Sequence, residues 1–197
     1  MAAPTHDDVL ARSIGDNTEP WTEERFLALP ANRCVELLDG ALLVSPSPGG
    51  PHQRLSFRIC YLLERARPDD VEALESVNVR VGPGKILIPD LAVVRGSGDG
   101  NTTWDAADVT LAVEILGPNT RSAHRTVKTG LYAAAGIAHH LEIELGPDGP
   151  DATLHRLEGG RYREIARARP GEELTLIEPV ALTVDLAALL AAPRLPG

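Results

Sequence analysis

Asp39-Gly40 lies between two apolar runs in the segment 33–44. An Asp-Gly pair in this setting is a strong signal for the two-residue turn of a β-hairpin, because both turn residues must adopt positive φ angles. The segment is therefore predicted to form two antiparallel strands joined at Asp39-Gly40, and the fold must contain a β-sheet.

The spacing of apolar residues predicts further strands and helices along the chain. Alternation at every second residue favours a strand, and recurrence at every third or fourth residue favours a helix. Strands are expected over 77–81, 86–94, 111–115 and 137–145, with a hairpin over 154–165 and a loop over 96–108; helices are expected over 22–29, 52–66, 119–136 and 184–191. This mixture predicts an α/β fold of the mixed α+β type.

Length and charge limit the class of protein. The 197 residues fit one domain, which we expect over 21–191 between a flexible leader, 1–20, and a short tail, 192–197. The 19 basic and 28 acidic residues give a net charge of −9, so any contact with nucleic acid needs a local basic patch or a bound cation. Two cysteines are too few for a disulfide framework. With no signal-peptide pattern and no membrane-spanning stretch, we expect a cytoplasmic protein without membrane contact.

Two acids lie inside apolar strand patterns, where a carboxylate does not help packing. Asp90 follows Pro89 in the segment 86–94, and Glu114 lies in the segment 111–115. A buried charge is costly unless it is paired or binds a cation. We therefore expect the two carboxylates on neighbouring strands, close enough to share a hard divalent cation, which prefers oxygen ligands. Without the metal the two charges repel, and at least one pKa should be raised.

Glu36, between Val35 and Leu37, is a third acid of this kind. The alternation of polar and apolar residues in a half-exposed strand would explain it equally well. The histidines nearest in sequence to these acids, His52 and His124, are expected to be surface or capping residues.

The helix expected over 119–136 has two different faces. One face carries Arg121, His124, Arg125, Lys128 and Tyr132, and the other is apolar, with Val127, Leu131, Ala134 and Ala135. Acids that hold a metal beside cationic side chains suit phosphodiester cleavage. The metal lowers the pKa of an attacking water, and Lys or Arg neutralises charge that develops on the phosphate. A solvated basic surface is the simpler alternative.

The order of these features resembles the restriction endonuclease-like family of bacterial proteins within the PD-(D/E)XK nuclease superfamily. The resemblance runs from about residue 21 to residue 189. It is carried by the segments 35–40, 45–46, 52–53, 89–94 and 113–121, together with Lys128, Tyr132 and Gly136. The most specific part is Pro-Asp at 89–90, followed 24 residues after Asp90 by Glu114 and then by a helix that contains a lysine.

The resemblance implies a restriction-endonuclease-like core, a central mixed β-sheet flanked by helices. It implies a site for Mg²⁺, or Mn²⁺ in its place, formed by Asp90, Glu114 and the backbone carbonyl of Ile115, with Glu36 assisting. The superfamily's usual lysine, two residues after the glutamate, is Leu116 here, and the family takes the lysine from the next helix, at Lys128. His124 stands where the family usually has an aspartate.

The sequence therefore predicts a divalent-metal-dependent DNA endonuclease of unknown specificity. Its catalytic residues would be Asp90, Glu114, Lys128 and Glu36, and its phosphate or DNA contacts Arg121, His124 and Arg125. Cleavage of both strands usually needs two sites, so a homodimer is expected. Two alternatives remain: a catalytically inactive nucleic-acid-binding or regulatory protein on the same fold, and a nuclease that acts on RNA or on damaged ends.

Overall fold

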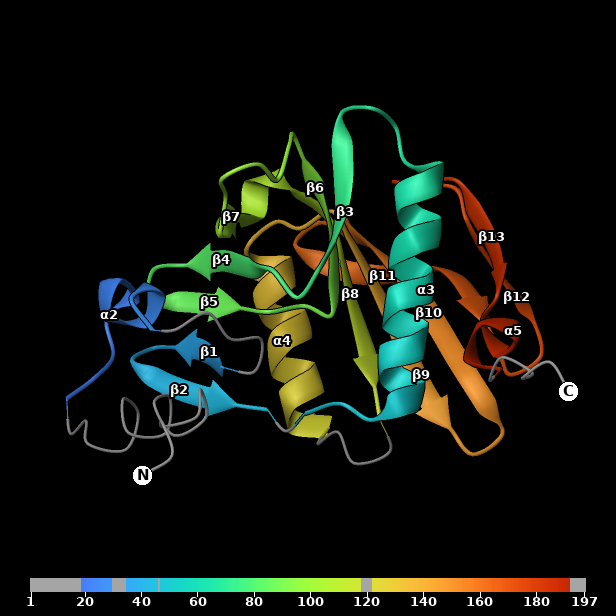
Figure 1. Cartoon of the computed structure of the whole chain (residues 1–197), viewed down its shortest axis with the longest axis horizontal. Helices are drawn as coiled ribbons and strands as arrows, with labels where there is room; N and C mark the ends of the chain where they lie inside the picture. The colour runs from blue at the N-terminus through green and yellow to red at the C-terminus, as the bar shows by residue number, and fades with distance from the viewer. Residues whose placement is uncertain (1–18, 30–34, 46, 118–121, 192–197) are drawn as a thin grey trace, which may run out of the picture.

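Two mixed β-sheets form the framework of the molecule (Figure 1). The structure is a computed structural model that describes residues 19–29, 35–45, 47–117 and 122–191, the side chains of 122–125 excepted. In order across the large sheet, the strands are β11 (Arg161–Ala168), β10 (Gly149–Glu158), β9 (His139–Gly146), β8 (Val109–Leu116), β6 (Leu91–Arg95) and β3 (Val71–Glu75). Strands β8 and β9 are parallel, and the other neighbours are antiparallel.

A smaller sheet and a few helices complete the fold. In order, the small sheet contains β2 (Ala41–Val44), β1 (Val35–Leu38), β5 (Lys85–Leu87), β4 (Asn78–Gly82) and β7 (Thr103–Asp105). The remaining elements are α2 (Glu23–Leu27), α3 (Gly50–Ala66), the 3-10 helix η1 (Ala106–Asp108), α4 (Ser122–Ala134), the strand pair β12 (Glu173–Leu176) and β13 (Leu182–Asp185), and α5 (Leu186–Leu190). The mixed α/β class expected from the sequence is confirmed. None of the described helices combines the length and apolarity that crossing a bilayer would require.

The hairpin predicted at Asp39-Gly40 is present. Strands β1 and β2 pair in antiparallel register, and the two turn residues have φ angles of 49° and 83°. Glycine is needed at the second position for a further reason, because a Cβ there would lie 2.9 Å from the Cβ of Pro20. The hairpin predicted over 154–165 is also present, because β10 and β11 pair in antiparallel register around a turn at Gly159-Gly160.

Helices α3 and α4 lie on opposite sides of β8. From α3, which stands in front of the large sheet in Figure 1, Leu55 and Leu63 pack in one core cluster with Val113 of β8. From α4, Tyr132 packs in a second cluster with Ala112 of β8 and with strands of the small sheet. All eight residues of β8 are buried, which is why this strand has an almost continuous apolar sequence. Glu114 interrupts that run on the α4 side.

The prediction of one strand over 86–94 is wrong. Strand β5 ends at Leu87 in the small sheet, and β6 begins at Leu91 in the large sheet. Pro89 lies between them and has no N–H for a ladder hydrogen bond. The three residues 88–90 therefore carry the chain from one sheet to the other, and Asp90 precedes a strand instead of alternating within one.

Several other boundaries differ from the sequence-based expectation. The segment 96–108, expected to be a loop, contains β7 and η1. The last helix starts at Leu186 rather than at 184, because the Asp185 carboxylate accepts hydrogen bonds from the N–H groups of Ala187 and Ala188 and so caps it. Strands β3, β12 and β13 were not predicted, because their exposed positions interrupt the apolar pattern.

Candidate active site

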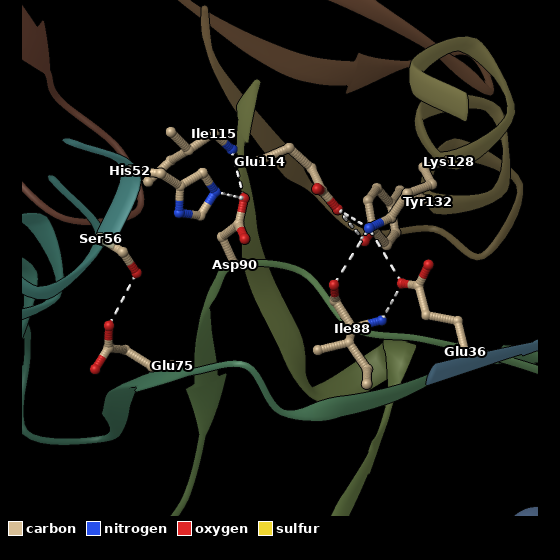
Figure 2. Close-up of polar contacts among 10 residues, drawn as sticks. All are labelled: Glu36, His52, Ser56, Glu75, Ile88, Asp90, Glu114, Ile115, Lys128 and Tyr132. Carbon is tan, nitrogen blue, oxygen red and sulfur yellow. Dashed lines mark hydrogen bonds and ion pairs between the residues drawn. The ribbon is translucent and has the colours of Figure 1, made fainter. Parts of the chain in front are cut away.

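The segment 88–90 lies at the centre of a group of polar side chains (Figure 2). Apart from the hydrogen-bonded pair Ser56 and Glu75, these side chains come from five parts of the fold: β1, the first turn of α3, the crossover between the sheets, the end of β8, and α4. The site is thus built where the two sheets meet, and residues distant in sequence are brought together by the crossover.

Asp90 is held by the end of β8 and by α3. Its Oδ2 atom accepts a hydrogen bond of 2.7 Å from the Ile115 N–H, and it lies 3.3 Å from Nε2 of His52 (Figure 2). Strand pairing explains this arrangement. Leu91, the first residue of β6, is opposite Val113, so Ile115 lies beyond the paired part of β6 and its N–H is free to bind a side chain.

Glu114 is buried on the α4 side of β8. Its Oε1 atom accepts a hydrogen bond of 2.7 Å from the Tyr132 hydroxyl and lies 2.6 Å from Nζ of Lys128. Burial raises the pKa of Glu114 to about 7; the Lys128 ammonium opposes this rise, and the charges of Asp90 and Glu36 add to it. The expected rise in a carboxyl pKa is therefore found, although desolvation contributes more than repulsion. Burial and the nearby Glu114 charge also raise the pKa of Tyr132.

Lys128 points into the site and not into solvent. Its ammonium lies 2.6 Å from Glu114 and 3.1 Å from Glu36, and it donates a hydrogen bond of 3.2 Å to the Ile88 carbonyl. Burial lowers the pKa of this lysine, but the two carboxylates outweigh burial and raise it above its usual value. The alternative of a solvated lysine is wrong, because the Lys128 side chain is only 19% exposed. The face with Lys128 and Tyr132 is turned inward, whereas Val127 is 48% exposed.

Glu36 lies beside Lys128 and is buried, so the alternative of a half-exposed strand position is also wrong. A single oxygen, Oε1, accepts a hydrogen bond of 2.6 Å from the Ile88 N–H and pairs with the Lys128 ammonium. Glu36 therefore fixes both the crossover segment and the lysine.

Four residues named from the sequence are thus brought together: Asp90, Glu114, Lys128 and Glu36. Arg121 lies outside the described residues, and so do the side chains of His124 and Arg125. The structure adds Tyr132 and His52 to the site. The expectation that His52 is a surface or capping residue is wrong, because its side chain is only 16% exposed and contacts Asp90. The helical spacing of four from Lys128 to Tyr132 was the available signal for the tyrosine, because both lie on one helix face.

The donor set suits a hard cation. Within the described residues there is no group of three or more His, Cys, Asp or Glu side chains arranged to enclose a metal. Mg²⁺ does not require one, because it keeps several waters and is usually bound by one or two carboxylates together with substrate phosphates. Asp90, Glu114 and the Ile115 carbonyl offer oxygen atoms only. Burial is the main cause of the raised pKa of Glu114, and a cation bound beside its carboxylate would oppose that rise by favouring the ionised form.

Fold and site together define a nuclease-like protein of mixed α/β architecture. The chain belongs to the Uma2 family, described as "Putative restriction endonuclease", whose model matches residues 23–188. Its fold is similar to the crystal structure of "a putative nuclease belonging to DUF820" from Anabaena variabilis ATCC 29413. The two share 17% sequence identity with a TM-score of 0.70, over 87% of this chain and 100% of the other. Comparison with curated proteins returns no match.

The raised pKa of Glu114 predicts that stability depends on pH in the metal-free protein. The folded value of about 7 exceeds the ordinary 4.5, so the folded state holds the proton more tightly and gains stability from it. This gain is complete below about pH 4.5 and is lost as pH rises through 7, a decrease of up to about 3 kcal/mol. Denaturant unfolding between pH 4.5 and 8, in the presence of a chelator, measures it.

The matched variants are Glu114→Gln and Glu164→Gln, the second at an exposed position of β11. Glu114→Gln should flatten the pH dependence in this window, and Glu164→Gln should retain the wild-type slope. Equal slopes for Glu114→Gln and wild type would contradict the assignment to Glu114.

Proposed function

We propose that this protein is a divalent-metal-dependent endonuclease that hydrolyses phosphodiester bonds in DNA. The observation that carries the proposal is the position of Lys128, whose ammonium lies 2.6 Å from Glu114 in the same polar group as Asp90. Phosphodiester hydrolysis needs a positive charge beside the metal site, and the Lys128 ammonium would provide it. Membership of a family described as "Putative restriction endonuclease" supports this type of chemistry.

Each residue has a distinct role in this proposal. Asp90, Glu114 and the Ile115 carbonyl would hold Mg²⁺ or Mn²⁺, which supplies an activated water and polarises the phosphate. Lys128 neutralises negative charge that builds up on the phosphate. Glu36 positions Lys128, and Tyr132 holds the Glu114 carboxylate. These roles follow the PD-(D/E)XK scheme, with the strand lysine moved to α4.

Contacts with DNA are proposed for the start of α4. Arg121, His124 and Arg125 precede Lys128 by seven, four and three residues, and would provide the local positive charge that a chain of net charge −9 needs beside phosphates. Binding should therefore weaken steeply with salt. A homodimer would supply the second site that double-strand cleavage requires.

A catalytically inactive DNA-binding or regulatory protein is the second candidate. It is favoured by the closed contact of Lys128 with both Glu36 and Glu114, which already balances much of the charge in the absence of substrate.

A plasmid-nicking assay separates the two candidates. Supercoiled DNA is incubated with the purified protein and Mg²⁺, Mn²⁺ or EDTA, and single-stranded DNA and RNA are tested in parallel. We expect conversion to nicked or linear DNA only with a divalent metal. Binding of DNA without cleavage of any substrate would reject the nuclease and support the inactive protein. Faster cleavage of RNA than of DNA would reject DNA as the substrate.

A further inference from the structure

His52 is a polar residue of the site to which neither the fold nor the family comparison gives a role. It lies in the first turn of α3, and its side chain is only 16% exposed. Nε2 lies 3.3 Å from Oδ2 of Asp90, whereas Nδ1 is buried without a hydrogen-bond partner among the described residues. The polar contact of the ring is therefore directed at Asp90 (Figure 2).

The imidazole ring of His52 is surrounded by the same residues that are proposed to bind the divalent cation. Burial lowers the pKa of His52, but the hydrogen bond and the charge of Asp90, the backbone of Ile115 and the charge of Glu114 outweigh it and raise the pKa. These are the same three residues that would supply the oxygen ligands of the metal. The ring thus lies where positive charge is favoured.

Direct coordination by His52 is not the best explanation of this contact. Imidazole nitrogen suits zinc, copper, nickel and iron, whereas Mg²⁺ and Mn²⁺ take carboxylate, carbonyl and water oxygens. Moreover, a nitrogen that donates its hydrogen to Asp90 has no lone pair directed at that site. A ring in this place competes with the cation for the same oxygen atoms.

We infer that His52 occupies the cation site in the metal-free protein, and that a divalent cation must displace the ring to reach Asp90 and the Ile115 carbonyl. The inference rests on the proposed function in taking these two groups and Glu114 as the metal ligands. His52 is a positioning residue in this view, because it holds Asp90 and the end of β8 when no metal is bound. Its place at the end of a helix aids displacement. The N-cap residue of α3, Gly49, makes no side-chain capping hydrogen bond, and such a first turn opens more easily than a helix interior.

Metal affinity without DNA tests the inference. Mn²⁺ binding is measured by calorimetry at one pH for the wild type, His52→Ala, Asp90→Asn and Gln53→Ala, which changes an exposed neighbour on α3. Displacement of the ring breaks a hydrogen bond to a charged carboxylate, so His52→Ala, which has no such bond to break, should bind Mn²⁺ more tightly, on the order of tenfold. Gln53→Ala should match the wild type. Without metal, His52→Ala should also melt at a lower temperature than Gln53→Ala.

The possible results separate this inference from the proposed function. Equal or weaker binding by His52→Ala, with binding lost in Asp90→Asn, overturns the inference and leaves the proposed metal site standing. Unchanged binding in Asp90→Asn rejects the proposed site itself, and an absence of binding in every variant rejects both. If His52→Ala does not fold, as judged by circular dichroism, His52→Asn serves instead, because it keeps a polar residue at the helix start but lacks the ring.

Discussion

Asp90→Asn is expected to abolish metal-dependent cleavage, lowering the rate by a factor on the order of 10³ or more, while the fold is retained. The amide has the shape of the carboxylate, and its oxygen can still accept the hydrogen bond from the Ile115 N–H. It lacks the negative charge that holds a divalent cation, and that cation contributes several kcal/mol of charge stabilisation in the transition state. Initial rates of supercoiled plasmid loss with Mn²⁺ measure the effect.

The control for this variant is Asp108→Asn, which removes the same charge from an exposed position in η1. It should cleave at the wild-type rate, so that a general effect of net charge on DNA binding is excluded. Cleavage by Asp90→Asn at the rate of Asp108→Asn would show that the activity does not depend on this carboxylate, or that it comes from another enzyme.

Lys128→Met is expected to reduce both activity and stability. Loss of one preorganised cation at the phosphate should cost a factor on the order of 10²–10³ in rate. The variant also leaves Glu36 and Glu114 buried without their common partner, and breaking a buried ion pair in this way costs about 3–5 kcal/mol. A solvent-exposed lysine would give neither effect. Nicking rates and denaturant unfolding measure the two effects separately.

A second substitution identifies the cause of the reduced stability. Glu36→Gln in the Lys128→Met background removes one of the two unpaired charges, so the double variant should be more stable than Lys128→Met alone. If Lys128→Met unfolds at the same denaturant concentration as the wild type, the contacts of Lys128 with the two acids do not stabilise the fold.

Much of the fold could be predicted from the sequence because its signals are local. The Asp39-Gly40 turn needs positive φ angles at both residues, and the buried strand β8 needs an apolar run. The prediction of a single strand over 86–94 failed because this segment is apolar on both sides of Pro89-Asp90. An apolar run does not show that Pro89 separates strands of two different sheets.

The site was predictable only in part, because its remaining contacts are tertiary. Acids in apolar strands marked Asp90, Glu114 and Glu36, since such residues need a partner when buried. His52 could not be assigned, because its contact with Asp90 depends on where the first turn of α3 lies relative to β8. Helical spacing placed Lys128 and Tyr132 on one face of α4, but it does not tell which face is turned inward.

The crossover at residues 88–90 makes the proposed activity depend on the assembly of the whole molecule. Glu36 belongs to the small sheet, Glu114 to the large sheet, and Lys128 to the helix between them. No single sheet contains a working set of groups. A partly synthesised chain, or one in which the small sheet has unfolded, would therefore lack the complete set of these three groups even where its large sheet is already formed. In a nuclease, this means that only the completed molecule could damage DNA.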